Sequence, residues 1–176
     1  MRRNKLLIVI FALAVFGLAN IACAGIIGMG TFSGNDNNVN AIETQIEAWF
    51  KNNGYGAIDV ELSIYAKVDE PATTKDGLTL TYDSGKKTGT WSTIVPIDFF
   101  TVKASNRYYI YWVNPADTSG NWTTAGLTNN GGQQPKISHL QTYTWANRSV
   151  PEPATFILMG IGLFVVAAWR KRRHPI

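Results

Sequence analysis

Residues 58–68 read Ile-Asp-Val-Glu-Leu-Ser-Ile-Tyr-Ala-Lys-Val. Apolar side chains occupy every second position, and the positions between them are mostly polar. Successive side chains of a strand point to opposite faces of a sheet, so this alternation predicts a half-buried strand with one wet face. It is the clearest strand signal in the chain, and it sets the expectation of a β-rich fold.

Five further segments are rich in β-branched or aromatic residues and are bounded by turn signals, as strands usually are. They are residues 78–82, 88–93, 99–104, 108–113 and 138–145. Asp83-Ser84-Gly85 provides one of the turns, and residues 114–134 are rich in loop-forming residues. Many short strands separated by turns predict a mostly β fold, namely a single antiparallel β-sandwich or jelly-roll-like domain.

One short helix is expected near the start of this domain. Asn38 or Asn40 would cap its beginning, and Asn52-Asn53-Gly54 would end it. Between these signals, four apolar residues fall on one face at helical spacing: Ile42, Ile46, Trp49 and Phe50.

Residues 1–24 have the three parts of a secretory signal peptide. Arg2, Arg3 and Lys5 form a basic start, residues 6–18 are apolar, and Ala22-Cys23-Ala24 is a small-x-small cleavage signal. We therefore expect signal peptidase to cut after Ala24. Two alternatives are a buried N-terminal helix and a lipoprotein with Cys23 as its lipid-bearing residue, although Asn20 departs from the Leu-like residue that a lipoprotein signal usually has there.

The C-terminal segment, residues 151–173, also has three parts. Pro151, Glu152 and Pro153 come first, and residues 154–169 then form an apolar stretch in which Thr155 is the one polar side chain. As a helix this stretch would span about 24 Å, which is slightly short for a bilayer core of about 30 Å. The basic cluster of Arg170, Lys171, Arg172 and Arg173 follows and is expected to stay in the cytoplasm.

Together, the Pro-Glu-Pro tripeptide, the apolar span and the basic cluster resemble the PEP-CTERM sorting signal. The resemblance implies a Gram-negative exported protein, held transiently in the inner membrane with its body in the periplasm. An exosortase would then remove the tail and leave the body at the cell surface or in the extracellular matrix. Members of this family are commonly linked with exopolysaccharide and biofilm. The alternative is a permanent C-terminal anchor that is never cut. Residues 102–140 are also similar to the globular part of short PEP-CTERM proteins, which implies no catalytic residues.

The composition describes a folded chain whose basic charge lies in its two ends. Of 176 residues, 45% are hydrophobic and 16% are charged, which excludes a disordered chain. Residues 25–150, the expected globular domain, hold nine basic and eleven acidic residues, although the whole chain has a net charge of +4. This domain therefore lacks the basic stripe that nucleic-acid binding needs.

The residues offer little support for catalysis or a cofactor. His139 and Ser138 are neighbours in an expected strand, so their side chains point to opposite faces and cannot form a nucleophile–base pair. His139 is expected to have a packing or hydrogen-bonding role. The single cysteine excludes a disulfide framework, and nucleotide-binding and zinc-protease motifs are absent from the sequence. We predict a protein that is not an enzyme and has no cofactor and no metal.

Two features suggest possible ligands. The run Gly34-Asn35-Asp36-Asn37-Asn38 contains oxygen ligands of the kind that Ca²⁺ prefers, but Asp36 is its one charged residue and no EF-hand spacing follows, so a turn that caps the helix is the expected explanation of the run. The body is also enriched in aromatic residues. Tyr109 and Tyr111 share one face of their strand, opposite Tyr108, Ile110 and Trp112, which are expected to face the core.

Three functions are therefore carried forward. The first is an exported, non-enzymatic surface or matrix protein sorted by an exosortase. The second is a carbohydrate-binding module for exopolysaccharide, with Tyr109, Tyr111 and the expected loop residue Trp122 as exposed contacts. The third is a polysaccharide-cleaving enzyme, which needs two carboxylates facing one groove.

Overall fold

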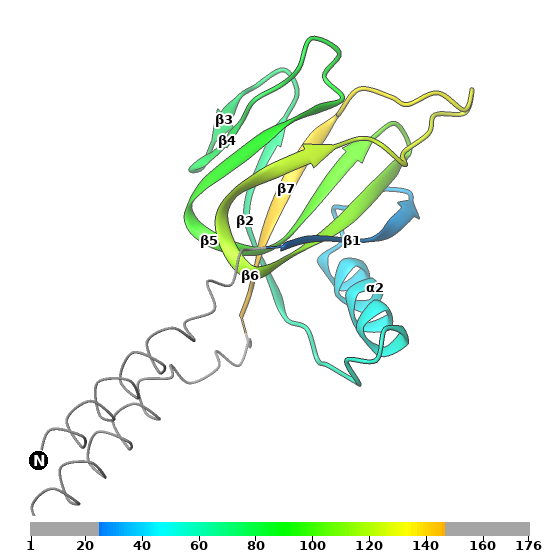
Figure 1. Cartoon of the computed structure of the whole chain (residues 1–176), viewed down its shortest axis with the longest axis vertical. Coiled ribbons are helices and arrows are strands. Elements are labelled where there is room, and N and C mark those ends of the chain that lie inside the picture. Colours follow the sequence, from blue (N-terminus) through cyan, green and yellow to red (C-terminus); the bar gives the residue numbers. More distant parts are fainter. Residues whose placement is uncertain (1–24, 147–176) are drawn as a thin grey trace, which may run out of the picture. The chain divides into compact units, whose positions relative to one another are not determined.

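The computed structural model describes residues 25–146. This part of the chain is mostly β, with seven strands in one open antiparallel sheet and one helix (Figure 1). The elements are β1 (Gly25–Ser33), α2 (Val39–Asn52), β2 (Leu62–Asp69), β3 (Thr74–Lys75), β4 (Leu78–Leu80), β5 (Thr88–Ala104), β6 (Arg107–Thr123) and β7 (His139–Trp145).

The two longest strands, β5 and β6, form the centre of the sheet. β1 pairs with the free edge of β6, which gives the order β1-β6-β5-β4-β3. The other edge of β5 pairs first with β4 and then, in its second half, with β7, which in turn pairs with β2. The prediction of a β-rich antiparallel domain with one short helix is confirmed. The prediction of a sandwich or jelly roll is corrected, because all seven strands belong to one open sheet.

β5 joins two segments that the sequence predicted as separate strands. It is 17 residues long, and its register against β6 shifts between Ser92 and Phe99, where Ile94 is 81% exposed. β6 is also longer than predicted and runs through Thr123, into the segment predicted to be loop. A strand that continues through an irregularity looks like two strands in a sequence, because the alternation of side chains is interrupted there.

The alternating segment at residues 58–68 forms β2. The strand starts later than predicted, and a bulge interrupts the alternation of its side chains. Regular pairing begins at Leu62 instead of Ile58, and a bulge lies between Ile64 and Ala66. A bulge inserts one extra residue and reverses which face the following side chains occupy. Leu62 accordingly packs on the helix side of the sheet, Ala66 and Val68 pack on the other side, and Ile64 is 48% exposed.

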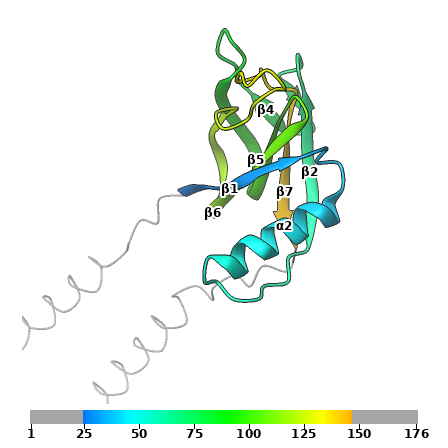
Figure 2. The same cartoon turned by 90° about the vertical axis from the view of Figure 1, so that its right-hand side faces the viewer.

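Apolar side chains form a cluster on each face of the sheet. One cluster includes Phe99, Ile110 and Tyr143 and packs against α2, which lies on one side of the sheet (Figure 2). The other cluster includes Trp91, Phe100 and Trp122 and is closed by Leu127 and Ile137 from the segment between β6 and β7. The domain therefore has a core on each side of a single sheet.

Helix α2 agrees with its prediction. The Asn38 side chain accepts a hydrogen bond from the Ala41 amide at 3.4 Å, and Asn53 is the C-terminal cap. Ile42, Ile46 and Phe50 are buried against the sheet. The helix also covers the start of β2, because Glu43 accepts a hydrogen bond from the Leu62 amide at 2.7 Å and Glu47 accepts one from the Val60 amide at 3.0 Å.

Candidate functional site

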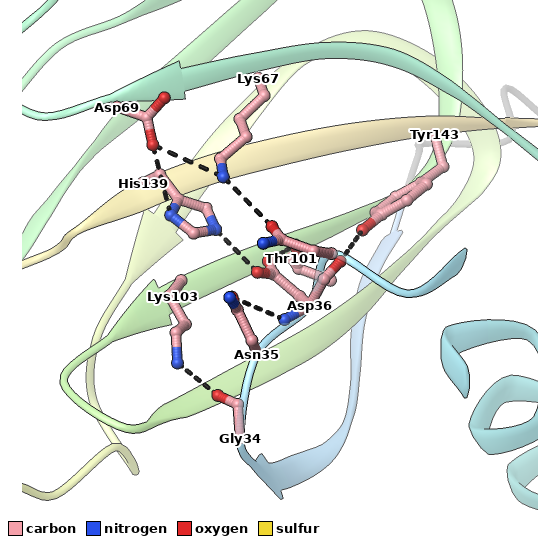
Figure 3. A network of polar contacts seen from close by, with 10 residues as sticks. Gly34, Asn35, Asp36, Lys67, Asp69, Thr101, Lys103, His139 and Tyr143 are labelled. Atoms are coloured by element: carbon pink, nitrogen blue, oxygen red, sulfur yellow. Dashed lines mark hydrogen bonds and ion pairs between the residues drawn. The ribbon is translucent and has the colours of Figure 1, made fainter. Parts of the chain in front are cut away.

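The most extensive buried polar cluster of the described residues surrounds Asp36. Asp36 lies in the loop between β1 and α2, and it is 0% exposed. Its Oδ2 accepts a hydrogen bond from the Thr101 hydroxyl at 2.6 Å, and its Oδ1 lies 2.7 Å from Nε2 of His139. Figure 3 shows the three side chains converging from the loop, β5 and β7. A buried carboxylate requires such partners, because taking a charge out of water is costly unless it is paired.

The loop that carries Asp36 is held to the sheet at several further points. The Lys103 ammonium on β5 donates to the Gly34 carbonyl, and the Gly34 amide donates to the Asn106 carbonyl at 3.0 Å. The Tyr143 hydroxyl on β7 donates to the Asp36 carbonyl at 3.5 Å. Gly34 has a φ of +99°, a backbone conformation that favours glycine. These contacts turn the Asp36 side chain inward and place Asn38 at the start of α2.

The cluster continues to the surface through the other nitrogen of His139. Nδ1 of His139 lies 3.5 Å from Oδ1 of Asp69, whose side chain is 59% exposed. The Lys67 ammonium lies 3.6 Å from the same oxygen and donates to Oδ1 of Asn37 at 3.4 Å (Figure 3). His139 therefore lies between a buried carboxylate and an exposed one.

The electrostatics of the cluster favour an ionised Asp36. Burial by itself would raise the pKa of Asp36, but the hydrogen bond and charge interaction with His139, together with the Thr101 hydroxyl, hold it below its ordinary value. Burial lowers the pKa of Lys103, and the nearby Asp36 carboxylate opposes that effect. The cluster thus stabilises a buried anion.

Among residues 25–146, the hydrogen bonds of His139 differ from those of a catalytic triad. A carboxylate that orients a histidine is found in catalytic triads, but there the histidine also contacts a serine, threonine or cysteine nucleophile. Here the Thr101 hydroxyl donates to Asp36, and the neighbouring Ser138 is exposed whereas His139 is buried. His139 has the hydrogen-bonding role expected from the sequence.

In the Asn- and Asp-rich loop, the single carboxylate is already engaged by other groups of the protein. Both carboxylate oxygens of Asp36 are engaged by Thr101 and His139. Among residues 25–146, no group of three His, Cys, Asp or Glu side chains gathers where it could hold a metal ion. The Asp36 carboxylate stabilises the packing of the loop, and Asn38 caps the helix. The sequence did not predict the pairing of Asp36 with His139, and the signal available was one acidic residue in an otherwise uncharged loop.

Tyr109 and Tyr111 lie on one face of β6, as the alternation predicted. Their rings stack with centroids 4.6 Å apart, and Tyr111 stacks on the buried Phe100 at 4.7 Å. Both are half-buried and pack against the core cluster, so they are less exposed than the sequence predicted. Burial, with a smaller contribution from Tyr109, raises the pKa of Tyr111 to about 12. Tyr108, Ile110 and Trp112 are buried on the other face, as predicted.

Trp122 does not have the position expected from the sequence. It lies in β6 instead of a loop, and it is 2% exposed. Its indole nitrogen donates to the carbonyl oxygens of Thr81 and Thr90, each at 3.2 Å. The correction has a physical reason: β6 continues beyond Asn114, so strand alternation turns Trp122 toward the core.

Comparison with known proteins identifies the C-terminal segment. Residues 149–173 match the model of the PEP-CTERM protein-sorting motif. The chain therefore carries this motif, which implies an exported, membrane-transiting protein that an exosortase processes. No curated protein and no solved structure matches the chain. The identification thus rests on the sorting motif and extends to 25 of 176 residues.

Several predicted residues lie outside the described part of the chain. They are the signal-peptide cleavage residues Ala22 and Ala24, the motif residues Pro151, Glu152 and Pro153, the expected membrane helix at residues 154–169, and the basic residues Arg170, Lys171, Arg172 and Arg173. The Pro-Glu-Pro tripeptide and the basic cluster fall inside the matched segment. Within residues 25–146, no helix is long and apolar enough to cross a membrane.

Proposed function

We propose that this chain is an exported, non-enzymatic protein of the cell surface or extracellular matrix, delivered there when an exosortase removes its C-terminal signal. The observation that carries the proposal is the PEP-CTERM protein-sorting motif at residues 149–173. The signal-like residues 1–24 support entry into the export pathway, with signal peptidase as the first processing enzyme. The inner membrane would hold the chain only until the tail is removed.

The folded body supports a structural role over an enzymatic one. Its buried polar groups around Asp36 are paired with one another, and His139 contacts no nucleophile in the described residues. Such a cluster stabilises the domain, which supports a structural role for these residues. The alternative hypothesis, a polysaccharide-cleaving enzyme, would require two carboxylates that face one groove.

The mass and location of the native protein test this proposal. Intact mass is measured after the producing cells are separated into inner-membrane and matrix fractions. We expect a matrix species that begins at Gly25 and ends near Pro151. A species that keeps residues 154–176 and stays in the inner membrane would overturn the proposal and leave a permanently tail-anchored periplasmic protein.

A variant of the sorting motif tests whether the Pro-Glu-Pro residues are needed for removal of the tail. Replacing Pro151, Glu152 and Pro153 together with alanine should leave the tail attached and the protein in the inner membrane. A control variant, Lys136→Ala, changes an exposed side chain of the body and should be processed like the natural protein. Normal processing of the triple variant would contradict recognition through the Pro-Glu-Pro residues.

Carbohydrate binding is a second candidate function. The observation that favours it is the stacked, half-exposed pair of Tyr109 and Tyr111, because aromatic rings are a common source of contact area at binding surfaces. The ligand would be the producer's own exopolysaccharide. Tyr109→Ala should then weaken binding to the isolated polysaccharide, measured by affinity electrophoresis, and unchanged mobility would argue against these two residues as the contact.

A further inference from the structure

The outer face of β3, β4, β5 and β6 carries a regular array of hydroxyl and amide side chains. On β5, residues 88, 90 and 92 are exposed, whereas Trp91 and Thr93 are buried. The neighbouring strands continue this alternation, and Figure 1 shows β3 and β4 beside β5. We call the resulting surface the hydroxyl face, and its nine uncharged residues are Thr74, Thr79, Thr81, Thr88, Thr90, Ser92, Ser119, Asn121 and Thr123.

The strand register aligns the hydroxyl face in three rows that run across the strands. The rows are Thr74, Thr79, Ser92 and Ser119; Thr81, Thr90 and Asn121; and Thr88 and Thr123. From standard sheet geometry, neighbours within a row are about 4.8 Å apart and successive rows are about 6.8 Å apart. The face therefore presents polar groups at a fixed two-dimensional spacing.

Hydrogen bonds within the rows hold these side chains in place. The Thr81 and Thr90 hydroxyls lie 2.8 Å apart, and those of Thr74 and Thr79 lie 3.3 Å apart. Each hydroxyl has one donor and two acceptor sites, so a hydroxyl that bonds its neighbour can still bond a ligand. Side chains that are fixed before binding lose less conformational entropy when a ligand arrives.

Buried side chains on the opposite side of the same strands hold the hydroxyl face in place. Leu78, Leu80, Trp91 and Trp122 are all buried there, and the indole of Trp122 bonds the backbone carbonyls of Thr81 and Thr90. An open depression of about 430 Å³ lies between two rows, lined by Thr88, Gly89, Thr90, Asn121, Trp122 and Thr123. The strand alternation turns the Trp122 side chain inward, so the backbone forms the floor of this depression.

The chemistry of the face indicates the class of its ligand. The nine side chains carry no charge, and the exposed side chain of Asp83 beside Thr88 is a carboxylate, so the face offers no cation to a nucleic acid, an anionic lipid or an acidic peptide. Hydroxyl and amide groups, together with threonine methyl groups, match a polymer that also alternates hydroxyl groups with apolar C–H faces. We propose that the hydroxyl face binds a neutral polysaccharide, with the sugar chain lying across β5 and β6 in the depression.

This inference rests on the second candidate function, but it places the contact on a different surface. Tyr109 and Tyr111 pack against the core cluster, whereas the hydroxyl face lies on the other side of the sheet. Variants of the two surfaces therefore separate the hypotheses. If only Tyr109→Ala loses binding, the carbohydrate function survives and the hydroxyl face is excluded as its site.

The test uses the full chain, purified in detergent, and affinity electrophoresis in gels that contain hydroxyethylcellulose, dextran or alginate. The triple variant Thr79→Val, Thr81→Val, Thr90→Val removes three hydroxyls and keeps the β-branched shape. The matched control is Thr128→Val, an exposed threonine outside the face. Thermal unfolding confirms that each variant is folded, and Ser92→Lys serves as a second probe if the triple variant does not fold.

We expect one of the two neutral polymers to retard the natural protein and the control equally. The triple variant should bind at least about tenfold more weakly, because three hydrogen bonds are lost. Equal retardation of the triple variant, retardation by alginate alone, or no retardation by any polymer would overturn the proposal. If the natural protein shapes ice crystals but neither neutral polymer retards it, the hydroxyl face binds ice. That result would also overturn the proposal.

Discussion

Nε2 of His139 lies 2.7 Å from Oδ1 of Asp36, although the two residues are 103 positions apart in the chain. This contact joins the loop between β1 and α2 to β7, the last described strand. Both residues are buried, at 0% exposure for Asp36 and 7% for His139. The pair therefore connects the two ends of the domain inside its interior.

Removal of His139 is expected to destabilise the domain strongly. His139→Ala leaves the Asp36 carboxylate buried with the Thr101 hydroxyl as its remaining side-chain partner. Breaking one side of a buried pair typically costs about 3–5 kcal/mol. Urea unfolding of the full chain in detergent, followed by tryptophan fluorescence, measures this loss.

The control is Lys136→Ala, which removes an exposed ion pair to Glu70. An exposed ion pair contributes little to stability, because water and salt screen the attraction between its charges. If His139→Ala and Lys136→Ala change the free energy of unfolding equally, the pair with Asp36 does not stabilise the domain.

Acid should weaken the domain partly through Asp36. Its pKa in the folded state is lowered, so the unfolded state takes up a proton first as the pH falls. The stability from Asp36 is thus fully present above the unfolded pKa of about 3.9. It is lost as the pH decreases through the folded pKa.

Unfolding at a series of pH values below 6 tests this expectation. Asp36→Asn should flatten the acid dependence of the free energy of unfolding, and the part that remains should reflect other carboxylates with lowered pKa values. In the described part of the chain those are Glu70, which bonds Lys86 and Lys136, and Asp83, which bonds the amides of Lys87 and Thr88. An acid profile identical to that of the natural protein would exclude Asp36 as a contributor.

Local signals in the sequence predicted the elements whose causes are local. The helix cap at Asn38 and the apolar spacing of Ile42, Ile46 and Phe50 depend on residues within a few positions of one another, and α2 was predicted correctly. The alternation of Tyr108, Ile110 and Trp112 likewise identified which residues of β6 enter the core.

Features that depend on distant partners were not predicted. β1 is rich in glycine and becomes a strand by pairing with β6, more than 70 residues later. The bulge in β2 that exposes Ile64 depends on its register with β7. The pairing of Asp36 with His139 exists only once β5 and β7 are side by side. Within a regular strand the alternation indicates which side chains share the buried face, but it does not report which strand lies beside which or where a bulge reverses the faces.

Gly89 is expected to tolerate no side chain. A Cβ at this position would lie 1.9 Å from the Thr81 carbonyl oxygen and 2.8 Å from the Trp122 ring. The backbone carbonyl cannot move aside as a flexible side chain could, so Gly89→Ala should cost about 1–3 kcal/mol or more. Thermal unfolding compares it with Gly131→Ala, where the nearest atom is a side-chain oxygen at 3.4 Å. Equal midpoints for the two variants would show that the strands separate to accept the methyl group.

Glu43 and Glu47 are expected to protect the edge of the sheet at the start of β2. Their carboxylates accept hydrogen bonds from the amides of Leu62 and Val60, which would otherwise be available to another strand. The double variant Glu43→Ala, Glu47→Ala should lower the free energy of unfolding by about 1–3 kcal/mol. It should also increase self-association, measured by sedimentation velocity in detergent.

Alanine favours helix at least as well as glutamate, so the double variant does not weaken α2 itself. The matched control Glu43→Gln, Glu47→Gln removes both charges but keeps an acceptor oxygen at each position. It should remain monomeric and nearly as stable as the natural protein, because the amides of Val60 and Leu62 keep their partners. If the glutamine variant associates as strongly as the alanine variant, charge repulsion protects this edge, and the two hydrogen bonds do not.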